Sequence, residues 1–318
     1  MDRLRVIFMG SAELACNSLQ ALRADRRTEM LAVVTQPDKP KGRALKLSPT
    51  PVGALAESLG LPLHKPKRAR DPEFIETLRE LRPDLIVVVA YGQLLPQSLL
   101  DVPRHGCLNV HTSLLPKYRG AAPIQWAIVD GEPETGVTIM QMDAGLDTGP
   151  ILSQARTPIT ADDTAAALHD RLATIGARLL IDTIPGYVSG ELKPCPQPAE
   201  GVSVARKISK EDGRIDWSRP ARAIFNQIRG FDPWPGAFTT LPLGGQPRLL
   251  KLWRARVFEN TSGTPGNVIT AGADGVQIGC GSGALLVTEL QLEGGRRMPV
   301  RDFLIGHPLA VGTAFGQP

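Results

Sequence analysis

Residues 85–90 read L-I-V-V-V-A and form the longest apolar run of the 318-residue chain. The run is far too short to cross a bilayer, because a membrane-spanning helix needs about 20 apolar residues. A short run rich in valine and isoleucine is typical of a strand buried on both faces of a parallel sheet. This run therefore predicts an α/β fold in which helices cover the sheet.

The N-terminal segment predicts the same architecture. Residues 4–9 have the pattern of a buried strand, Gly10-Ser11 that of a turn, and residues 12–23 that of a helix. A Gly turn before a helix N-terminus can bind an anion, but the G-x-G-x-x-G pattern of dinucleotide sites is missing from this sequence. We predict a Rossmann-like, open and mainly parallel sheet.

The chain is long enough for two domains. Residues 190–207 carry several prolines and no apolar period, which predicts an extended linker. We therefore expect a first domain over residues 1–189 and a second over 208–318. The second has short apolar runs separated by Gly, among them residues 248–258 and 284–292, a spacing typical of a small, open, OB-like β barrel.

The segment from Cys107 to Pro123 reads C-L-N-V-H-T-S-L-L-P-K-Y-R-G-A-A-P. It begins as a short strand, and a period of two puts Asn109 and His111 on one face. A single His at the end of a strand is most often structural. An amide beside an imidazole can nevertheless donate to a developing oxyanion and move a proton.

The string N-x-H-x-S-L-L-P, the following R-G-A-A-P and the D-A-G-L-D-T-G of residues 143–149 resemble the signature of the folate-dependent formyltransferases. The resemblance implies transfer of a formyl group from the co-substrate 10-formyltetrahydrofolate to an amine. It implies three catalytic residues, Asn109, His111 and Asp147. The residues that it implies for folate binding are Leu94, Ser113, Leu114, Leu115, Pro116 and Asp143.

Within the family, the resemblance is closest to the members that formylate initiator methionyl-tRNA. Those members have a basic insertion like residues 36–46, in which Pro37, Pro40 and Gly42 argue against regular structure. The resemblance implies that this loop binds tRNA through Lys39, Lys41, Arg43 and Lys46.

The charge distribution also fits a polyanionic partner. Residues 206–318 carry 14 Lys and Arg against 9 Asp and Glu, a net charge of +5, whereas the rest of the chain sums to −1. A basic face of this kind is more often only solvated, but it is also what phosphate contacts require.

The four cysteines are scattered and include no C-x-x-C pair, so we expect no metal site, no disulfide framework and a cytoplasmic protein. No signal-peptide pattern opens the chain, and we expect no membrane association. The resemblance also implies a monomer.

Two alternatives stay open. The acceptor could be an amino sugar nucleotide, or water in a formyltetrahydrofolate hydrolase, because these relatives share N-x-H, S-L-L-P and the distal Asp. The second alternative is a non-catalytic RNA-binding protein on the same scaffold. The intact Asn109, His111 and Asp147 argue against it.

Overall fold

The computed structural model describes residues 3–41 and 46–316, and the chain divides into two compact units. The first unit comprises residues 1–123, 134–158 and 169–205. The second comprises residues 124–133, 159–168 and 206–318.

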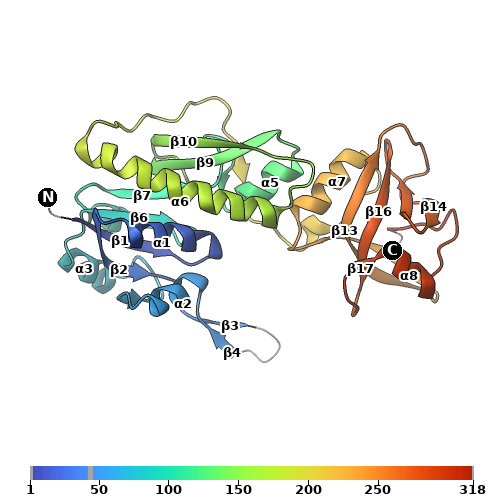
Figure 1. The fold of residues 1–318 in the computed structure, drawn as a ribbon, viewed down its shortest axis with the longest axis horizontal. Coiled ribbons are helices and arrows are strands. Elements are labelled where there is room, and N and C mark those ends of the chain that lie inside the picture. The colour runs from blue at the N-terminus through green and yellow to red at the C-terminus, as the bar shows by residue number, and fades with distance from the viewer. Residues whose placement is uncertain (1–2, 42–45, 317–318) are drawn as a thin grey trace. The chain divides into compact units, whose positions relative to one another are not determined.

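A seven-stranded sheet forms the centre of the first unit, with the order β10-β9-β7-β6-β1-β2-β5 (Figure 1). The five strands from β7 to β5 are parallel, and β9 and β10 are antiparallel additions at one edge. Their bounds are β1 Leu4–Gly10, β2 Thr28–Val34, β5 Leu63–His64, β6 Leu85–Val89, β7 Cys107–His111, β9 Glu134–Gln141 and β10 Ile151–Pro158.

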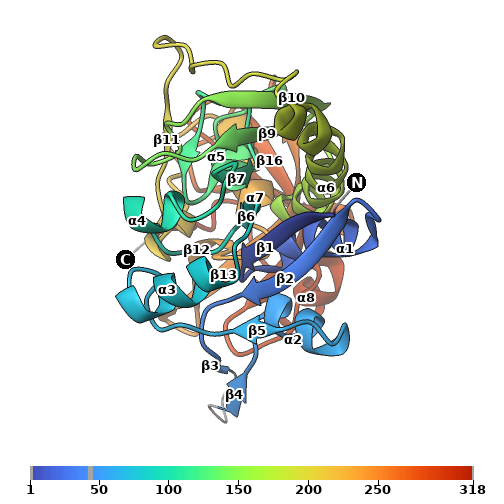
Figure 2. The ribbon, with the colours of Figure 1, turned by 90° about the vertical axis from the view of Figure 1, so that its left-hand side faces the viewer.

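Helices cover both faces of this sheet. Figure 2 shows α1 and α6 on one face and α3 and α4 on the other. The core beneath α3 and α4 is built from alternate strand residues such as Ile7, Met9 and Ile86, as the period of two requires. The bounds are η1 Glu13–Ala15, α1 Cys16–Ala24, α2 Pro51–Ser58, α3 Pro72–Glu80, α4 Gln97–Leu100 and α6 Ala165–Ser189. Helix α5, Pro123–Val129, belongs to the second unit from residue 124 onward, as do the first residues of α6.

The basic insertion has regular structure, so the prediction of an irregular loop was wrong. Strand β3 (Lys39–Lys41) pairs antiparallel with β4 (Lys46–Ser48), and the hairpin extends away from the main sheet (Figures 1 and 2). Pro40 stands opposite Leu47 in this pairing. Both strands of a two-stranded ribbon are edge strands. An edge strand tolerates a proline because one side of it makes no hydrogen bonds to a further strand, so the missing N–H breaks no ladder.

The second unit contains an antiparallel sheet whose path is β12-β13-β16-β15-β14, with β17 paired to β16. The first unit has a mainly parallel α/β sheet, and the second has an open antiparallel sheet with five strands along its path. This arrangement confirms the predicted α/β fold class with a small second β domain. The bounds are η2 Glu211–Gly213, α7 Ala221–Gly230, β12 Ala237–Leu243, β13 Gln246–Phe258, β14 Val268–Gly272, β15 Gly275–Gly279, β16 Ala284–Leu292, β17 Met298–Pro299 and α8 Val300–Gly306.

Most of the segment predicted as a linker, residues 190–205, belongs to the first unit and pairs with it at two places. The backbone of Cys195 forms an isolated antiparallel β-bridge with that of Ile151. Strand β11 (Val204–Ala205) pairs with β8 (Arg119–Gly120). Within residues 3–41 and 46–316, no helix is long and apolar enough to span a membrane.

Candidate functional site

Three polar side chains converge where the central strands of the first unit end. Asn109 and His111 come from β7, and Asp147 comes from the loop after β9. Asn109 Nδ2 donates to Asp147 Oδ1 at 3.2 Å, and His111 Nδ1 lies 3.7 Å from Asp147 Oδ2. Residues that are 38 apart in sequence thus form one cluster. The His111 side chain is 6% exposed and the Asp147 side chain 15%, so the cluster is mostly shielded from water.

The tautomer of His111 follows from its second contact. Nε2 lies 2.9 Å from the backbone carbonyl of Tyr118, and a carbonyl can only accept. Nε2 therefore carries a proton and donates it to Tyr118. In the neutral ring, Nδ1 is then the free base, and it faces the Asp147 carboxylate.

The backbone around the cluster is held in an uncommon conformation. The described part of the chain has four non-Gly residues with positive φ, and three of them flank this site: Ala90 (φ 44°), Tyr118 (φ 61°) and Asp147 (φ 52°). Such residues cost about 1–3 kcal/mol each and are frequent at functional sites. The Gly120 backbone N–H donates to Asp147 Oδ2 at 2.8 Å and offsets part of this cost.

Asp143 organises the loop that carries Asp147. Its carboxylate accepts hydrogen bonds from the Gly145 N–H at 3.0 Å and from the Thr148 hydroxyl at 2.7 Å. Gly149 closes the loop, because a Cβ there would lie 1.9 Å from the carbonyl oxygen of Gln141. These contacts give Asp143 a structural role in the loop, beside the folate contact that the resemblance implies.

Gln197 holds the same loop from the segment that follows α6, and sequence reasoning did not identify it. Its Nε2 donates to the carbonyls of Asp147 at 2.8 Å and Gly149 at 2.7 Å. Its Oε1 accepts from Arg119 Nη2 at 2.7 Å. A glutamine between prolines has no periodic signal, and its partner is 50 residues away, so nothing local marks it.

Residues 113–116 follow β7 in the chain, and two of their side chains are buried. The Ser113 hydroxyl donates to the Lys117 carbonyl at 2.6 Å, and Leu115 is 4% exposed. Leu114 and Pro116 are half-buried. A ligand at this segment would therefore meet mainly the side chains of Leu114 and Pro116.

Two large apolar side chains stand open on the loops around the cluster. Leu94, after β6, is 78% exposed, and Leu146, beside Asp147, is 52% exposed. A flat apolar ligand could cover them and gain from their burial.

Cys107, on the same strand as His111, is not a candidate nucleophile. Burial raises the pKa of its thiol to about 12, so the thiolate required for attack does not form near neutral pH. The described part of the chain contains no group of three or more His, Cys, Asp or Glu side chains that could hold a metal ion.

Of the four cations predicted to bind tRNA, Lys39, Lys41 and Lys46 lie on β3 and β4. Lys39 is exposed, and its Nζ donates to Gln36 Oε1 at 2.7 Å. Lys41 and Lys46 are strand residues whose side chains, like the whole of Arg43, lie outside the described part.

Two family models match the chain. The model described as "Formyl transferase" matches residues 3–184, and the model described as "Formyl transferase, C-terminal domain" matches residues 207–308. Among solved structures, an N-formyltransferase from Helicobacter canadensis is similar with a TM-score of 0.66 at 20% identity, over 89% of this chain and 98% of that one. HypX from Aquifex aeolicus, in complex with tetrahydrofolic acid, gives a TM-score of 0.63 at 20% identity, over 95% of this chain and 47% of that one. At this identity the two structures support the fold alone.

Curated sequences are much more similar. Methionyl-tRNA formyltransferase from Trichlorobacter lovleyi is 52% identical over 98% of this chain and 97% of its own length. The enzyme of the same name from Myxococcus xanthus is 51% identical over 98% of both chains. The chain therefore belongs to the formyl transferase family, in the group of the methionyl-tRNA formyltransferases.

Proposed function

We propose that the protein transfers the formyl group of 10-formyltetrahydrofolate to the α-amino group of initiator methionyl-tRNA. The products are N-formylmethionyl-tRNA, which serves translation initiation, and tetrahydrofolate. The observation that carries this proposal is the convergence of Asn109, His111 and Asp147 in a chain that is about half identical, over its full length, to methionyl-tRNA formyltransferases.

Formyl transfer requires that an amine attack the formyl carbon, so that negative charge develops on the formyl oxygen. Asn109 Nδ2 has two N–H groups, one of which is held by Asp147 Oδ1. The second is available to this oxygen, and the bond to Asp147 limits rotation of the amide. Loss of such a preorganised donor typically raises the barrier by about 2.7–4 kcal/mol.

His111 is suited to proton transfer because its free nitrogen is Nδ1. Nδ1 can take the proton that the attacking amine loses as the new C–N bond forms. It can return that proton to the departing folate nitrogen as the old C–N bond breaks, so no net proton is gained or lost. Asp147 Oδ2, 3.7 Å from Nδ1, stabilises the imidazolium between these steps. The bond to Tyr118 keeps the ring orientation throughout.

The folate co-substrate fits the open side of the cluster. Exposed Leu94 and Leu146 offer apolar surface to an aromatic ring, and the half-buried side chains of Leu114 and Pro116 would add to it. Asp143 keeps the loop in place for this contact through Gly145 and Thr148.

The tRNA would meet the β3–β4 hairpin and the basic second unit. In this proposal residues 1–189 are the catalytic domain, 190–207 the linker and 208–318 the tRNA-binding domain of a cytoplasmic monomer. The excess charge of +5 on residues 206–318 supports a polyanionic partner.

A turnover assay tests the proposal directly. The protein is incubated with 10-formyltetrahydrofolate and initiator methionyl-tRNA, and the aminoacyl ester is analysed by mass for the added formyl group. Formylation of this acceptor and not of a nucleotide-linked amino sugar is the expected result. Formylation of the sugar alone, or release of free formate alone, would replace the proposal with one of the two enzyme alternatives.

A further inference from the structure

The segment of residues 197–205 lies directly against the loop that follows β7. Val204 pairs with Arg119 and Ala205 with Gly120 in the short parallel ladder between β11 and β8. The approach is close, because a Cβ on Gly120 would lie 2.8 Å from the Ala205 carbonyl oxygen. The two stretches of backbone are therefore packed without room for a side chain at this point.

One residue of this segment, Ser203, holds the backbone on both sides of the Tyr118 Cα. The Tyr118 N–H donates to Ser203 Oγ at 2.9 Å, across a sequence separation of 85 residues. The Arg119 N–H donates to the Ser203 carbonyl, also at 2.9 Å. The φ and ψ of Tyr118 are rotations between the two peptide units that carry these N–H groups, so Ser203 fixes its backbone conformation.

The second of these peptide units also contacts the cluster. The Tyr118 carbonyl and the Arg119 N–H belong to one planar unit, and in a trans unit these groups point in opposite directions. The N–H end is held by Ser203, and the carbonyl end accepts from His111 Nε2 at 2.9 Å. A single rigid group thus connects Ser203 with the imidazole.

The conformation of Tyr118 needs this support. Its φ is 61°, and a non-Gly residue keeps a positive φ only where its surroundings hold it there. Tyr118 is 7% exposed, so its N–H would have little access to water if the Ser203 hydroxyl were lost. A shielded donor without an acceptor is costly. The hydroxyl therefore stabilises the conformation in which the Tyr118 carbonyl faces His111.

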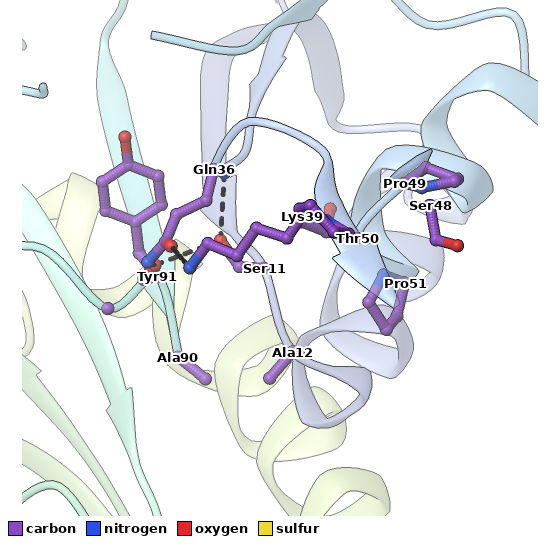
Figure 3. Close-up of a pocket in the computed structure, with 12 residues that line it drawn as sticks. Ser11, Ala12, Gln36, Lys39, Ser48, Pro49, Thr50, Pro51, Ala90 and Tyr91 are labelled. Carbon is purple, nitrogen blue, oxygen red and sulfur yellow. Dashed lines mark hydrogen bonds between the residues drawn. The ribbon is translucent and has the colours of Figure 1, made fainter. Parts of the chain in front are cut away.

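The turn after the neighbouring strand β6 is held in a comparable way (Figure 3). Ala90 has a φ of 44°, and its carbonyl accepts from the Ser11 N–H at 3.3 Å. Ser11 Oγ donates to the carbonyl of the next residue, Tyr91, at 3.0 Å. In both turns a serine from a distant segment holds the backbone at and beside the left-handed residue.

We propose that Ser203 is a positioning residue for formyl transfer. Through Tyr118 it keeps the Nε2–H of His111 in its hydrogen bond, so that Nδ1 stays the free base that faces Asp147. Ser203 itself touches no reacting atom. The assignment rests on the proposed function, because it concerns the ring that moves the proton. Together with Gln197, which holds the loop of Asp147, it makes the 197–205 segment part of the active site.

The kinetic test compares Ser203→Ala with Ser203→Thr, which retains the hydroxyl. Ser189→Ala is the control, because the Ser189 hydroxyl donates to Gly186 within its own helix at 3.1 Å. We expect Ser203→Ala to lower kcat about tenfold at unchanged KM for both substrates, since small displacements of a reacting group have effects of this size or larger. Ser203→Thr should stay within about threefold of wild type, and Ser189→Ala should equal it.

A double-mutant cycle separates positioning from a general loss of structure. In the His111→Ala background, the additional change Ser203→Ala should cost much less than in wild type, because the ring through which Ser203 acts is gone. An equal loss in both backgrounds would overturn the assignment. Thermal unfolding checks that each variant folds. If Ser203→Ala does not fold, Ser203→Cys, which has a similar shape and a weaker acceptor, takes its place with the same expectations.

A spectroscopic measurement tests the same role without turnover. The ¹⁵N chemical shifts of labelled histidine distinguish the Nε2–H from the Nδ1–H tautomer, and the signal of His111 is the one missing from His111→Ala. Wild type and Ser203→Thr should show the Nε2–H form. Ser203→Ala should show a share of the Nδ1–H form, because Nδ1–H can donate to Asp147 once the carbonyl is released.

An unchanged tautomer in folded Ser203→Ala would overturn the assignment. If wild type does not formylate methionyl-tRNA, the proposed function fails, but the tautomer comparison still decides whether Ser203 orients His111.

Discussion

His111 Nε2 donates to the backbone carbonyl of Tyr118 at 2.9 Å, and this bond leaves Nδ1 as the nitrogen that faces Asp147. The ring orientation is therefore set by a main-chain group, and the Asp147 carboxylate, held by Asn109 and Gly120, faces Nδ1 where it can stabilise charge. Tyr118 itself has a positive φ of 61°, so its carbonyl is aimed at the ring by an uncommon backbone conformation.

Replacement of His111 by Ala should lower the rate of formyl transfer about 10²- to 10⁴-fold, because the group that exchanges the proton is gone. Added imidazole should restore part of the rate by entering the vacated space. The measurement is single-turnover formylation with and without imidazole, with thermal unfolding as the check on folding. A rate near that of wild type would contradict the proton-transfer role.

Asp147→Asn and Asp143→Asn form a matched pair. Asn at 147 retains an oxygen for the Gly120 N–H but loses the acceptor for Asn109 Nδ2 and the charge that stabilises the imidazolium, so kcat should fall about 10²-fold or more with little change in KM. Asn at 143 retains an acceptor for Gly145, so kcat should stay within about threefold of wild type. A selective rise in KM for folate in the second variant would instead favour a direct folate contact.

Gln197 should act as a positioning residue. Gln197→Leu removes both donors to the loop carbonyls, and we expect kcat to fall about tenfold at unchanged KM. Gln197→Glu retains an acceptor for Arg119 but has no amide donor, so it should be equally slow. The pH dependence of the remaining activity should match wild type, because Gln197 touches no reacting atom. A normal kcat in the Leu variant would remove this role.

Local patterns in the sequence were sufficient to predict the elements in which apolar residues form a continuous run or alternate with polar ones. The run 85–90 became β6 over Leu85–Val89, and the period of two put Asn109 and His111 together on β7. The contact with Asp147 could be expected only from the resemblance, since residues 38 apart meet through the antiparallel strand β9. Their catalytic roles stay predictions.

The features that sequence reasoning missed depend on context beyond a local window. The hairpin exists although Pro40 stands in a strand, because its pairing has two free edges. Strand β12, Ala237–Leu243, was not expected, although its residues pair along their whole length with β13. Gln197 and the Tyr118 carbonyl gain their importance only from distant partners, which no periodicity encodes.

The hairpin cations should determine the salt dependence of RNA binding. Replacing Lys41, Arg43 and Lys46 by Ala should weaken tRNA binding and flatten the plot of log Kd against log salt concentration. The slope should fall by about 0.9 for each phosphate contact that is lost. The control replaces Lys67, Arg68 and Arg70, a basic run expected to be only solvated. Equal slopes for wild type and the hairpin variant would point to another RNA surface.

Ionisation of Asp212, near the start of the segment 206–318, should affect the free energy of unfolding. Hydrogen bonds from Arg206, and then from the backbone and hydroxyl of Ser209, hold the pKa of Asp212 well below its usual range. Arg206 in turn lies 4.6 Å over the ring of Trp126, so the carboxylate fixes a stacked guanidinium.

A carboxylate with a lowered pKa in the folded state stabilises the protein above its unfolded pKa, about 3.9, and loses this contribution as the pH falls below that value. Asp212→Asn should therefore reduce the free energy of unfolding by about 1 kcal/mol at pH 7, and the difference from wild type should shrink at pH 3. Urea unfolding at both pH values measures it. Glu211→Gln, an adjacent change in an exposed ion pair with Arg214, should have a smaller effect at pH 7. A difference for Asp212→Asn that is as large at pH 3 as at pH 7 would mean that the carboxylate charge does not stabilise this segment.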